Sequence, residues 1–338
     1  MLQVFGSLIM WLPLLVVLGL LLLYRWYRFS LILENVTDKY VFISGCDTGF
    51  GNLLAKQLDR RGLRVLAACQ TQAGAENLKK ETSSRLQTTV LDVTDSQSVS
   101  SAAKWVDDIV SHQGLWGLVN NAGINFPFGT NEWLTKEDFQ KVLDVNLLGL
   151  IDVTLKMLPL VRRAKGRVVN VASVAGRVAF IGGGYCLAKF GVEAFSDKLR
   201  RELVLFGVKV SIIEPGYFRT AMSDSTALRE KINSIWERAS EEVRKSYGQN
   251  YFEKYCDSAF SGTSKTNKNL HLVTDCMEHA LTAVHPMTRY SAGWDAKLLF
   301  LPLSYLPTVL VDFLLTKINV GPHSCDYKEK KLCTTFKR

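Results

Sequence analysis

The chain has 338 residues, of which 47% are hydrophobic and 22% charged, with a formal net charge of +9 at pH 7. These values suit one large α/β domain or two small ones, and because the basic residues are scattered along the chain they do not indicate nucleic-acid binding. The seven cysteines are odd in number and widely spaced, which indicates buried thiols and not a disulfide framework, and no spacing typical of a metal site occurs.

An uncharged apolar run occupies residues 4–24, long enough at 1.5 Å per residue to cross a hydrocarbon core of about 30 Å. A cleaved signal peptide would need a basic start, a shorter apolar core and a small-residue cleavage site, and none is present. Residues 1–28 are therefore predicted to be a membrane anchor. Arg25 and Arg28 follow the run and no basic residue precedes it, which favours a cytosolic body. Glycosylation at Asn35 would require the opposite orientation.

A short buried strand is expected at 39–44, followed at once by a glycine-rich turn and an amphipathic helix. Such a turn lets the backbone approach a pyrophosphate and aims the amide groups of the helix start at its charge. Strands and helices go on alternating, and no glycine- or serine-rich linker interrupts them. The sequence therefore predicts a single Rossmann-type domain over 36–297, with a doubly wound parallel sheet.

Several polar residues are predicted at the carboxyl ends of strands, the edge where open α/β sheets bind ligands. Asp92 and Asn120 each end a strand, although either could only form a turn or cap a helix. Ser173 follows the buried strand 167–172. Asn146 lies in an apolar helical stretch, 135–165, where asparagine is unfavourable unless its side chain is used, so a buried kink or a bound water competes with simple exposure.

Tyr185 and Lys189 are four residues apart in a predicted helix, so their side chains share one face. A tyrosine that carries protons at neutral pH needs its pKa lowered by about three units from ~10, and a nearby ammonium is the simplest cause. The spacing alone proves little, because Tyr327 and Lys331 repeat it in the polar tail. The surroundings of Tyr185 favour the first pair.

These motifs resemble, in content and order, those of the short-chain dehydrogenase/reductase family over residues 39–220. Longer strings are similar to the membrane-bound retinol and hydroxysteroid dehydrogenases, and they extend the resemblance over nearly the whole chain after the anchor. The strings are GCDTGFG at 45–51, GLWG at 114–117, EWL at 132–134, MLPLV at 157–161 and DAK at 295–297.

The resemblance implies that Tyr185 is the proton carrier, that Ser173 hydrogen-bonds the substrate oxygen and that Lys189 lowers the tyrosine pKa while binding the nicotinamide ribose. Asn146 would hold the water of a proton relay. It also implies the endoplasmic reticulum membrane as location and allows a homodimer. The implied cofactor-binding residues are Ser44, Gly45, Cys46, Asp47, Gly49, Phe50, Gly51, Asp92, Val93, Asn120, Ala122, Gly123, Tyr185, Lys189, Pro215, Gly216 and Thr220.

The choice between NAD and NADP is read from the residues that end the second strand. The family commonly places there an acid for the ribose 2′-hydroxyl or an arginine for a 2′-phosphate. Ala68, Cys69 and Gln70 are neutral, and so is Thr48, where phosphate-preferring members carry a basic residue. The prediction is NAD, with NADP less favoured, and with oxidation as the direction.

The substrate is predicted to be a lipophilic alcohol, because apolar residues flank the reacting groups. Val174, Phe180, Tyr217 and Phe218 are expected to line its pocket with Ser173, although ordinary core positions account for each equally well. Residues 217–268 form an insert long enough to cover a bulky ligand. The apolar segment 298–318, broken by prolines, is expected to lie on the membrane or beside the pocket, and the basic tail 319–338 to meet anionic headgroups.

The function predicted from the sequence is NAD-dependent oxidation of a retinol-type alcohol or of a 3α- or 17β-hydroxysteroid to the carbonyl. The alternative is a catalytically weak member that binds nucleotide or lipid and acts by interaction. The complete set of Ser173, Tyr185, Lys189 and Asn146 favours the enzyme, because a binding module has no need of a proton relay.

Overall fold

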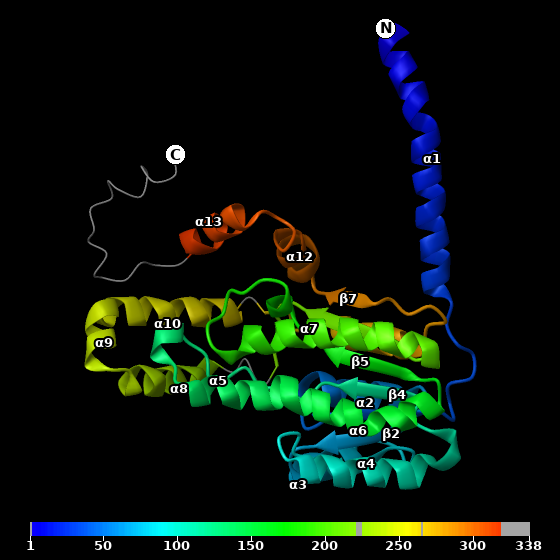
Figure 1. Ribbon diagram of the computed structural model, residues 1–338, viewed down its shortest axis with the longest axis horizontal. Helices are drawn as coiled ribbons and strands as arrows, with labels where there is room; N and C mark the ends of the chain where they lie inside the picture. The colour runs from blue at the N-terminus through cyan, green and yellow to red at the C-terminus, as the bar shows by residue number, and fades with distance from the viewer. Residues whose placement is uncertain (1, 221–224, 265, 319–338) are drawn as a thin grey trace.

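A seven-stranded parallel sheet forms the centre of the computed structural model, which describes residues 2–220, 225–264 and 266–318 (Figure 1). The strand order is β3-β2-β1-β4-β5-β6-β7, and every neighbouring pair is parallel. This confirms the predicted doubly wound sheet. The strands are β1 (Tyr40–Ser44), β2 (Arg64–Cys69), β3 (Gln87–Val90), β4 (Gly117–Asn120), β5 (Arg167–Val171), β6 (Lys209–Pro215) and β7 (Arg289–Ala292).

Helices cover both faces of the sheet because successive strand residues point to opposite sides. Val41 and Ile43 pack in one apolar cluster with α2 (Gly49–Arg60) and α11 (His271–Thr282). Phe42, between them, packs in the other cluster with α4, α6 and α7. The remaining bounds on these faces are α3 (Gln72–Lys80), α4 (Ser96–Val110), α6 (Leu150–Arg163) and α7 (Gly184–Leu203).

The helical stretch expected at 135–165 is interrupted by a wider turn. Helix α5 (Lys136–Leu143) starts with a reciprocal cap between Thr135 and Asp138, and a π-helical segment, η3 (Asp144–Gly149), joins it to α6. Asn146 lies inside this π segment. Of the readings that the sequence allowed for Asn146, the structure supports a buried local distortion, since its side chain is 1% exposed.

The insert after β6 forms three helices beside the sheet: α8 (Ser225–Arg238), α9 (Glu241–Tyr247) and α10 (Gln249–Ser264) (Figure 1). They pack through an aromatic cluster whose centre is Trp133, in the loop before α5. Ring centres of Trp236, Tyr247 and Tyr255 lie 4.9, 5.6 and 5.1 Å from that of Trp133. The insert is therefore fixed to the domain by aromatic packing.

The N-terminal helix α1 (Leu2–Ser30) extends away from the domain (Figure 1). Its part Pro13–Ser30 is long and apolar enough to cross a membrane, and none of these residues is buried in the protein. Its end is attached to the domain. Ile32 pairs with Ala283 after α11, and Phe29 stacks on His279 with ring centres 3.9 Å apart.

The chain after β7 returns to the side from which α1 extends (Figure 1). It forms η7 (Ala296–Phe300), α12 (Leu301–Leu303) and α13 (Thr308–Ile318). Val311 and Leu315 of α13 pack against a cluster that includes Phe300. The basic tail 319–338, with the second tyrosine–lysine pair, lies outside the described residues.

Candidate active site

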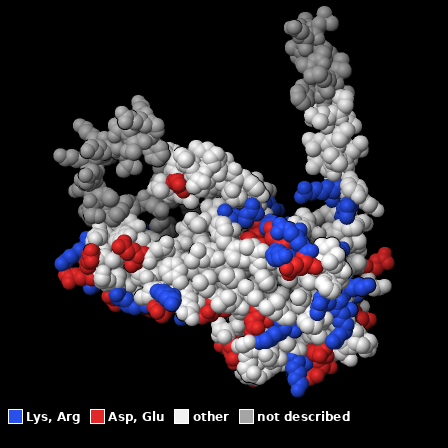
Figure 2. Space-filling model, in the orientation of Figure 1, with Lys and Arg blue, Asp and Glu red and all other residues white. Residues whose placement is uncertain are grey.

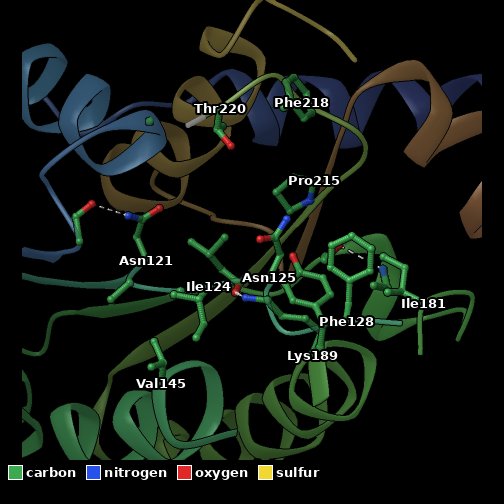
Figure 3. A pocket seen from close by; sticks show the side chains of 18 of the residues that line it. Asn121, Ile124, Asn125, Phe128, Val145, Ile181, Lys189, Pro215, Phe218 and Thr220 are labelled. Atoms are coloured by element: carbon green, nitrogen blue, oxygen red, sulfur yellow. Dashed lines mark hydrogen bonds between the residues drawn. The ribbon is translucent and has the colours of Figure 1, made fainter. Parts of the chain in front are cut away.

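A cavity of about 1280 Å³ opens at the carboxyl ends of the central strands. It lies where the strand order reverses between β1 and β4, the position at which this type of sheet binds ligands. Figure 3 shows Pro215, Phe218 and Thr220 approaching this space from one side, and Val145 and Lys189 from the other. The cavity is large enough to hold a dinucleotide and a second ligand together.

The glycine turn after β1 is shaped to receive an anion. Gly45 and Gly51 allow close packing, because a methyl group on Gly45 would come 2.7 Å from the Cα of Ala122, and one on Gly51 would collide with the Gly45 carbonyl. Helix α2 begins at the cavity without a side-chain cap from Thr48, so its first amide groups face a space that Gly49 also lines. These residues fit the pyrophosphate of a dinucleotide.

Ser44 and Asn121 fix this turn to the neighbouring strand. The Ser44 hydroxyl accepts hydrogen bonds from the amides of Asn121 and Ala122, both at 3.1 Å. The Asn121 side chain donates to the carbonyls of Ser44 and Gly45, both at 3.0 Å. Ser44 thus supports the turn from beneath and does not line the cavity. Asn121 does line the cavity, although the sequence reasoning did not single it out.

Ser173 and Tyr185 meet in the cavity from two elements. Ser173 follows β5, and its hydroxyl accepts from the Ala175 amide at 3.1 Å, which fixes the side chain at the start of a short 3₁₀ turn. Tyr185 lies in the first turn of α7, and its phenol is hydrogen-bonded to Ser173. The predicted pair is therefore assembled, with both hydroxyl groups in the cavity lining.

Lys189 is buried one turn after Tyr185. Its ammonium donates to the Val171 carbonyl at 2.8 Å and lies 5.6 Å from the centre of the Tyr185 ring. Burial lowers the pKa of Lys189 to about 8, while the nearby carboxylate of Glu193 opposes that change. Lys189 thus lies beneath the phenol. Its apolar surroundings disfavour the charged form, so it loses its proton more readily than an exposed lysine does.

The sequence predicted a lowered pKa for Tyr185, and the structure contradicts this prediction. Burial raises the pKa of Tyr185, and the hydrogen bond from Ser173 opposes the rise without overcoming it. The reason is that removal from water disfavours the charged phenolate, and the Lys189 ammonium is bonded to a backbone carbonyl.

Asn146 holds the loop that follows β4. Its side-chain oxygen accepts from the Ile124 amide at 2.8 Å, and its side-chain nitrogen donates to the Ile124 carbonyl at 2.7 Å. Two direct bonds to the backbone of one residue, Ile124, position the loop that carries Ala122 and Gly123 along the cavity. The relay water remains a prediction for this residue.

Most of the predicted site residues line the cavity, and five of them do not. Asn120 is 3% exposed and donates to Thr154 and Asn170, both at 2.8 Å, so it braces strands beneath the site. Cys46 is buried, and burial raises its pKa. Asp92 lines the cavity and also closes a turn on Thr94. The predicted residues absent from the lining are Ser44, Cys46, Gly51, Asn120 and Asn146.

The other end of the cavity is apolar and aromatic, and it includes residues that the sequence reasoning missed. Phe180, Tyr217 and Phe218 line it as expected. The insert contributes further side chains, which only its amphipathic pattern hinted at. The residues from the insert are Leu228, Tyr251, Tyr255 and Ala259, and Phe128 joins them from the loop after β4. Ile181 also lines this end, as its place between Ser173 and Tyr185 suggested.

Comparison with known proteins agrees with this geometry. A family model described as short chain dehydrogenase matches residues 39–231. Retinol dehydrogenase 16 of Homo sapiens is 60% identical over 93% of this chain and 99% of its own length. The 17-beta-hydroxysteroid dehydrogenase type 6 of Homo sapiens is 58% identical over 91% of this chain and 97% of its own.

Solved structures support the fold alone. A short-chain dehydrogenase from Streptomyces avermitilis is similar with a TM-score of 0.64 at 23% identity, covering 83% of this chain and 95% of that one. A short chain dehydrogenase from Burkholderia cenocepacia in complex with NADP has a TM-score of 0.62 at 19% identity, covering 83% and 99%.

Proposed function

This chain belongs to the short-chain dehydrogenase family, and from that premise we propose that it oxidises the hydroxyl group of a retinol-type or hydroxysteroid alcohol. The observation that carries the proposal is the Ser173–Tyr185 hydroxyl pair, because it stands between the glycine turn and an aromatic cavity. The similarity to retinol dehydrogenase 16 and to 17-beta-hydroxysteroid dehydrogenase type 6 supports both substrate types.

The roles of the residues follow from their positions. In the proposed reaction Tyr185 takes the proton of the substrate hydroxyl as the phenolate, and Ser173 holds that oxygen through its own hydroxyl group. Because burial raises the pKa of Tyr185 in the protein alone, the positive charge of an oxidised nicotinamide, together with Lys189, would have to offset that rise. Lys189 anchors the base of the site through the Val171 carbonyl and supplies positive charge beneath the phenol. A bound nicotinamide supplies the acceptor for the hydride.

We further propose NAD as the preferred cofactor. The support is chemical: the residues that end β2 and the glycine turn include no lysine or arginine that could pair with a 2′-phosphate.

The test of the proposed function is Tyr185→Phe, with turnover and cofactor binding measured separately. We expect kcat to fall by roughly 100-fold or more, while NADH binds as before, because only the proton carrier is removed. Tyr217→Phe is the matched control. Tyr217 lines the same cavity, but the proposed reaction gives its hydroxyl group no part in proton transfer. All-trans-retinol and a 3α-hydroxysteroid, each with NAD and NADP, form the panel. A wild-type chain that turns over neither substrate would favour the non-catalytic alternative.

We propose that α1 anchors the protein in the endoplasmic reticulum membrane with the domain in the cytosol, and that α13 lies on the same membrane. Exposed apolar side chains on α13 support this, and Figure 2 shows little charge on that segment and basic residues at the base of α1. The exposed residues are Val309, Leu310, Phe313 and Leu314. Protease added to sealed microsomes should digest the domain, and an intact domain would refute the orientation.

A homodimer is a further proposal, supported by apolar side chains exposed on one region of η3, α6 and α7. These are Leu148, Leu155, Leu187 and Phe190. Leu155→Glu with Leu187→Glu should convert a dimer to a monomer in detergent, as measured by light scattering, and an unchanged mass would refute this face.

A further inference from the structure

Titratable side chains follow one another at four-residue intervals along α7, so they share one face of the helix. From the cavity outward they are Tyr185, Lys189, Glu193 and Asp197. The first two line the cavity, whereas Glu193 lies outside its lining and Asp197 is 24% exposed. The lysine of the site is therefore followed, one turn further along α7, by a carboxylate that the proposed reaction does not yet use.

Glu193 and Lys189 are buried together beneath the turn that carries Ser173. Lys189 is 6% and Glu193 7% exposed. The short 3₁₀ turn after Ser173, η4 (Val174–Gly176), packs closely on both residues. A methyl group on Gly176 would come 2.8 Å from the Lys189 carbonyl oxygen and 3.2 Å from Cγ of Glu193. The two opposite charges therefore interact through packed protein, which screens them less than water does.

Charged groups from three other elements surround the Glu193 carboxylate. Arg289 on β7 donates to its Oε2 atom at 3.0 Å and also contacts Asp197 at 3.0 Å. Glu214 on β6 and Arg177, which follows η4, form a second ion pair at 3.0 Å. The other oxygen of Glu193, Oε1, is buried and has no hydrogen-bond partner among the described residues. A buried oxygen without a donor makes the ionised carboxylate costly, and a nearby ammonium reduces that cost.

We propose that Glu193 is a positioning residue of this active site, whose carboxylate, held by Arg289, keeps the Lys189 ammonium charged beneath Tyr185. The proposal rests on the proposed function, because it gives Glu193 a part in the same proton transfer. Tyr185 needs a nearby cation to react as the phenolate, and burial works against the charge of Lys189. Glu193 opposes that effect of burial without touching the substrate, since it does not line the cavity.

The pKa values of the two residues define the pH range in which Glu193 acts. Burial, and then the charge of Glu214, raise the pKa of Glu193 to about 7, so its carboxylate is ionised above that pH. Burial lowers the pKa of Lys189 to about 8, so its ammonium persists below that pH. Below this range Glu193 has no charge to offer, and above it Lys189 has none to keep. Glu193 therefore supports the lysine between these two values.

The first experiment measures the single-turnover rate of NADH formation by the full chain in detergent, because this rate separates the chemical step from product release. The alcohol is all-trans-retinol or a 3α-hydroxysteroid, whichever the wild type oxidises. Glu193→Gln should slow the rate roughly 5-fold at about pH 7.5, but less than about 2-fold at about pH 6 and about pH 9.5. Glu193→Asp keeps the charge and should recover part of the loss. A purely structural role predicts the same loss at every pH.

The matched control is Glu214→Gln, which removes another buried carboxylate of the same cluster. The Glu214 side chain is 1% exposed, and its charge acts on the pKa of Glu193 but not on that of Lys189. Without Glu214 the carboxylate of Glu193 ionises more readily, so we expect no loss of rate at about pH 7.5 relative to about pH 6. A loss in this control with the pH dependence of Glu193→Gln would overturn the role of Glu193.

A second measurement needs neither turnover nor a bound cofactor. In protein labelled with ¹³C at the Cε atoms of lysine, NMR follows the ionisation of Lys189, whose signal is identified by its loss in Lys189→Arg. The midpoint should fall by about one pH unit in Glu193→Gln and not in Glu214→Gln. The wild-type signal should also show a smaller step at about pH 7, where Glu193 ionises, which keeps the test valid if Glu193→Gln does not fold.

The outcomes separate the role of Glu193 from the proposed function. An unchanged midpoint in Glu193→Gln, no wild-type step at about pH 7, or a rate loss equal at every pH would each overturn the role of Glu193 and leave the dehydrogenase proposal intact. A wild type that oxidises neither alcohol would overturn the proposed function, and with it the part of Glu193 in proton transfer.

Discussion

Arg289, at the start of β7, is surrounded by three carboxylates. Its guanidinium lies 3.0 Å from oxygens of both Glu193 and Asp197 on α7, and 3.7 Å from Glu214 on β6. The side chains of Glu214 and Glu193 are only 1% and 9% exposed. Arg177 contacts Glu214 at 3.0 Å but leaves Glu193 dependent on Arg289. A buried charge that loses its partner is costly, so this arginine is expected to matter for stability.

The substitution Arg289→Met should lower the free energy of unfolding by about 3–5 kcal/mol near neutral pH, the cost of breaking a buried ion pair. Burial, followed by the charge of Glu214, already raises the pKa of Glu193 to about 7, and Arg289 opposes that rise. Without the arginine the pKa of Glu193 rises further. Between the ordinary pKa of a glutamate and this raised value, Glu193 is protonated in the folded variant and ionised in the unfolded chain. The stability of the variant therefore falls as pH rises through this range.

The loss should therefore shrink at low pH. Near pH 5 Glu193 is protonated in the folded protein whether or not Arg289 is present, so we expect the destabilisation to fall by about half. Urea unfolding of the full chain in mild detergent, at about pH 5 and pH 7.5, measures both values. Adding Glu193→Gln to Arg289→Met should restore about 1 kcal/mol or more at the higher pH.

The matched control is Arg163→Met, because Arg163 also bonds a carboxylate, Asp107, at 2.8 Å, but on the surface, with side chains 39% and 51% exposed. Its loss should cost about 1 kcal/mol or less. Equal losses at both pH values, or a control as damaging as Arg289→Met, would refute the role assigned to burial.

Gly51→Ala should weaken NADH binding by roughly 100-fold, measured by fluorescence titration, because its methyl group would displace the Gly45 carbonyl from the turn. Trp133→Ala should cost about 3–5 kcal/mol of stability and raise the KM for retinol more than it lowers kcat, since it removes the centre of the aromatic cluster; an unchanged KM would contradict this. Burial lowers the pKa of His279, so stability should fall as pH drops below its ordinary pKa, and His279→Phe, which keeps the stacking on Phe29, should lose that dependence in thermal unfolding.

The sheet and its cofactor turn were predictable because their signals are local. A strand, a glycine turn and a helix follow one another within some twenty residues, and each has its own hydrophobic period. The strand order places Ser173 and the glycine turn at one edge without further information. The helical spacing of Tyr185 and Lys189 was local too, and the start of α7 then has to return to the same edge for Tyr185 to meet Ser173.

The parts that the sequence could not provide depend on long-range contacts. Asp47 and Thr71 are far apart in the chain, and only the parallel pairing of β1 with β2 brings the turn after one strand to the end of the other. Asn120 ends its strand as predicted, but its side chain turns inward to Asn170 and not to the cavity. The Tyr185 pKa was misjudged because spacing predicts which charges are near, whereas desolvation depends on how deeply the fold buries the phenol.

The proposed anchor and the wall of the cavity are joined through a single short strand. Ile32, which follows α1, pairs with Ala283 between α11 and β7, and the residues after β7 support the cavity wall, since the Asp295 carboxylate accepts from the Tyr217 amide at 2.6 Å. Phe300 then packs on Phe180 and Tyr217, with ring centres 4.9 and 5.8 Å apart. β7 is the edge strand of the sheet, and its pairing with β6 ties this connection to the core. With α1 in a membrane as proposed, these contacts link the apolar end of the cavity to the anchor, which would keep the site close to the bilayer from which a lipophilic alcohol would come.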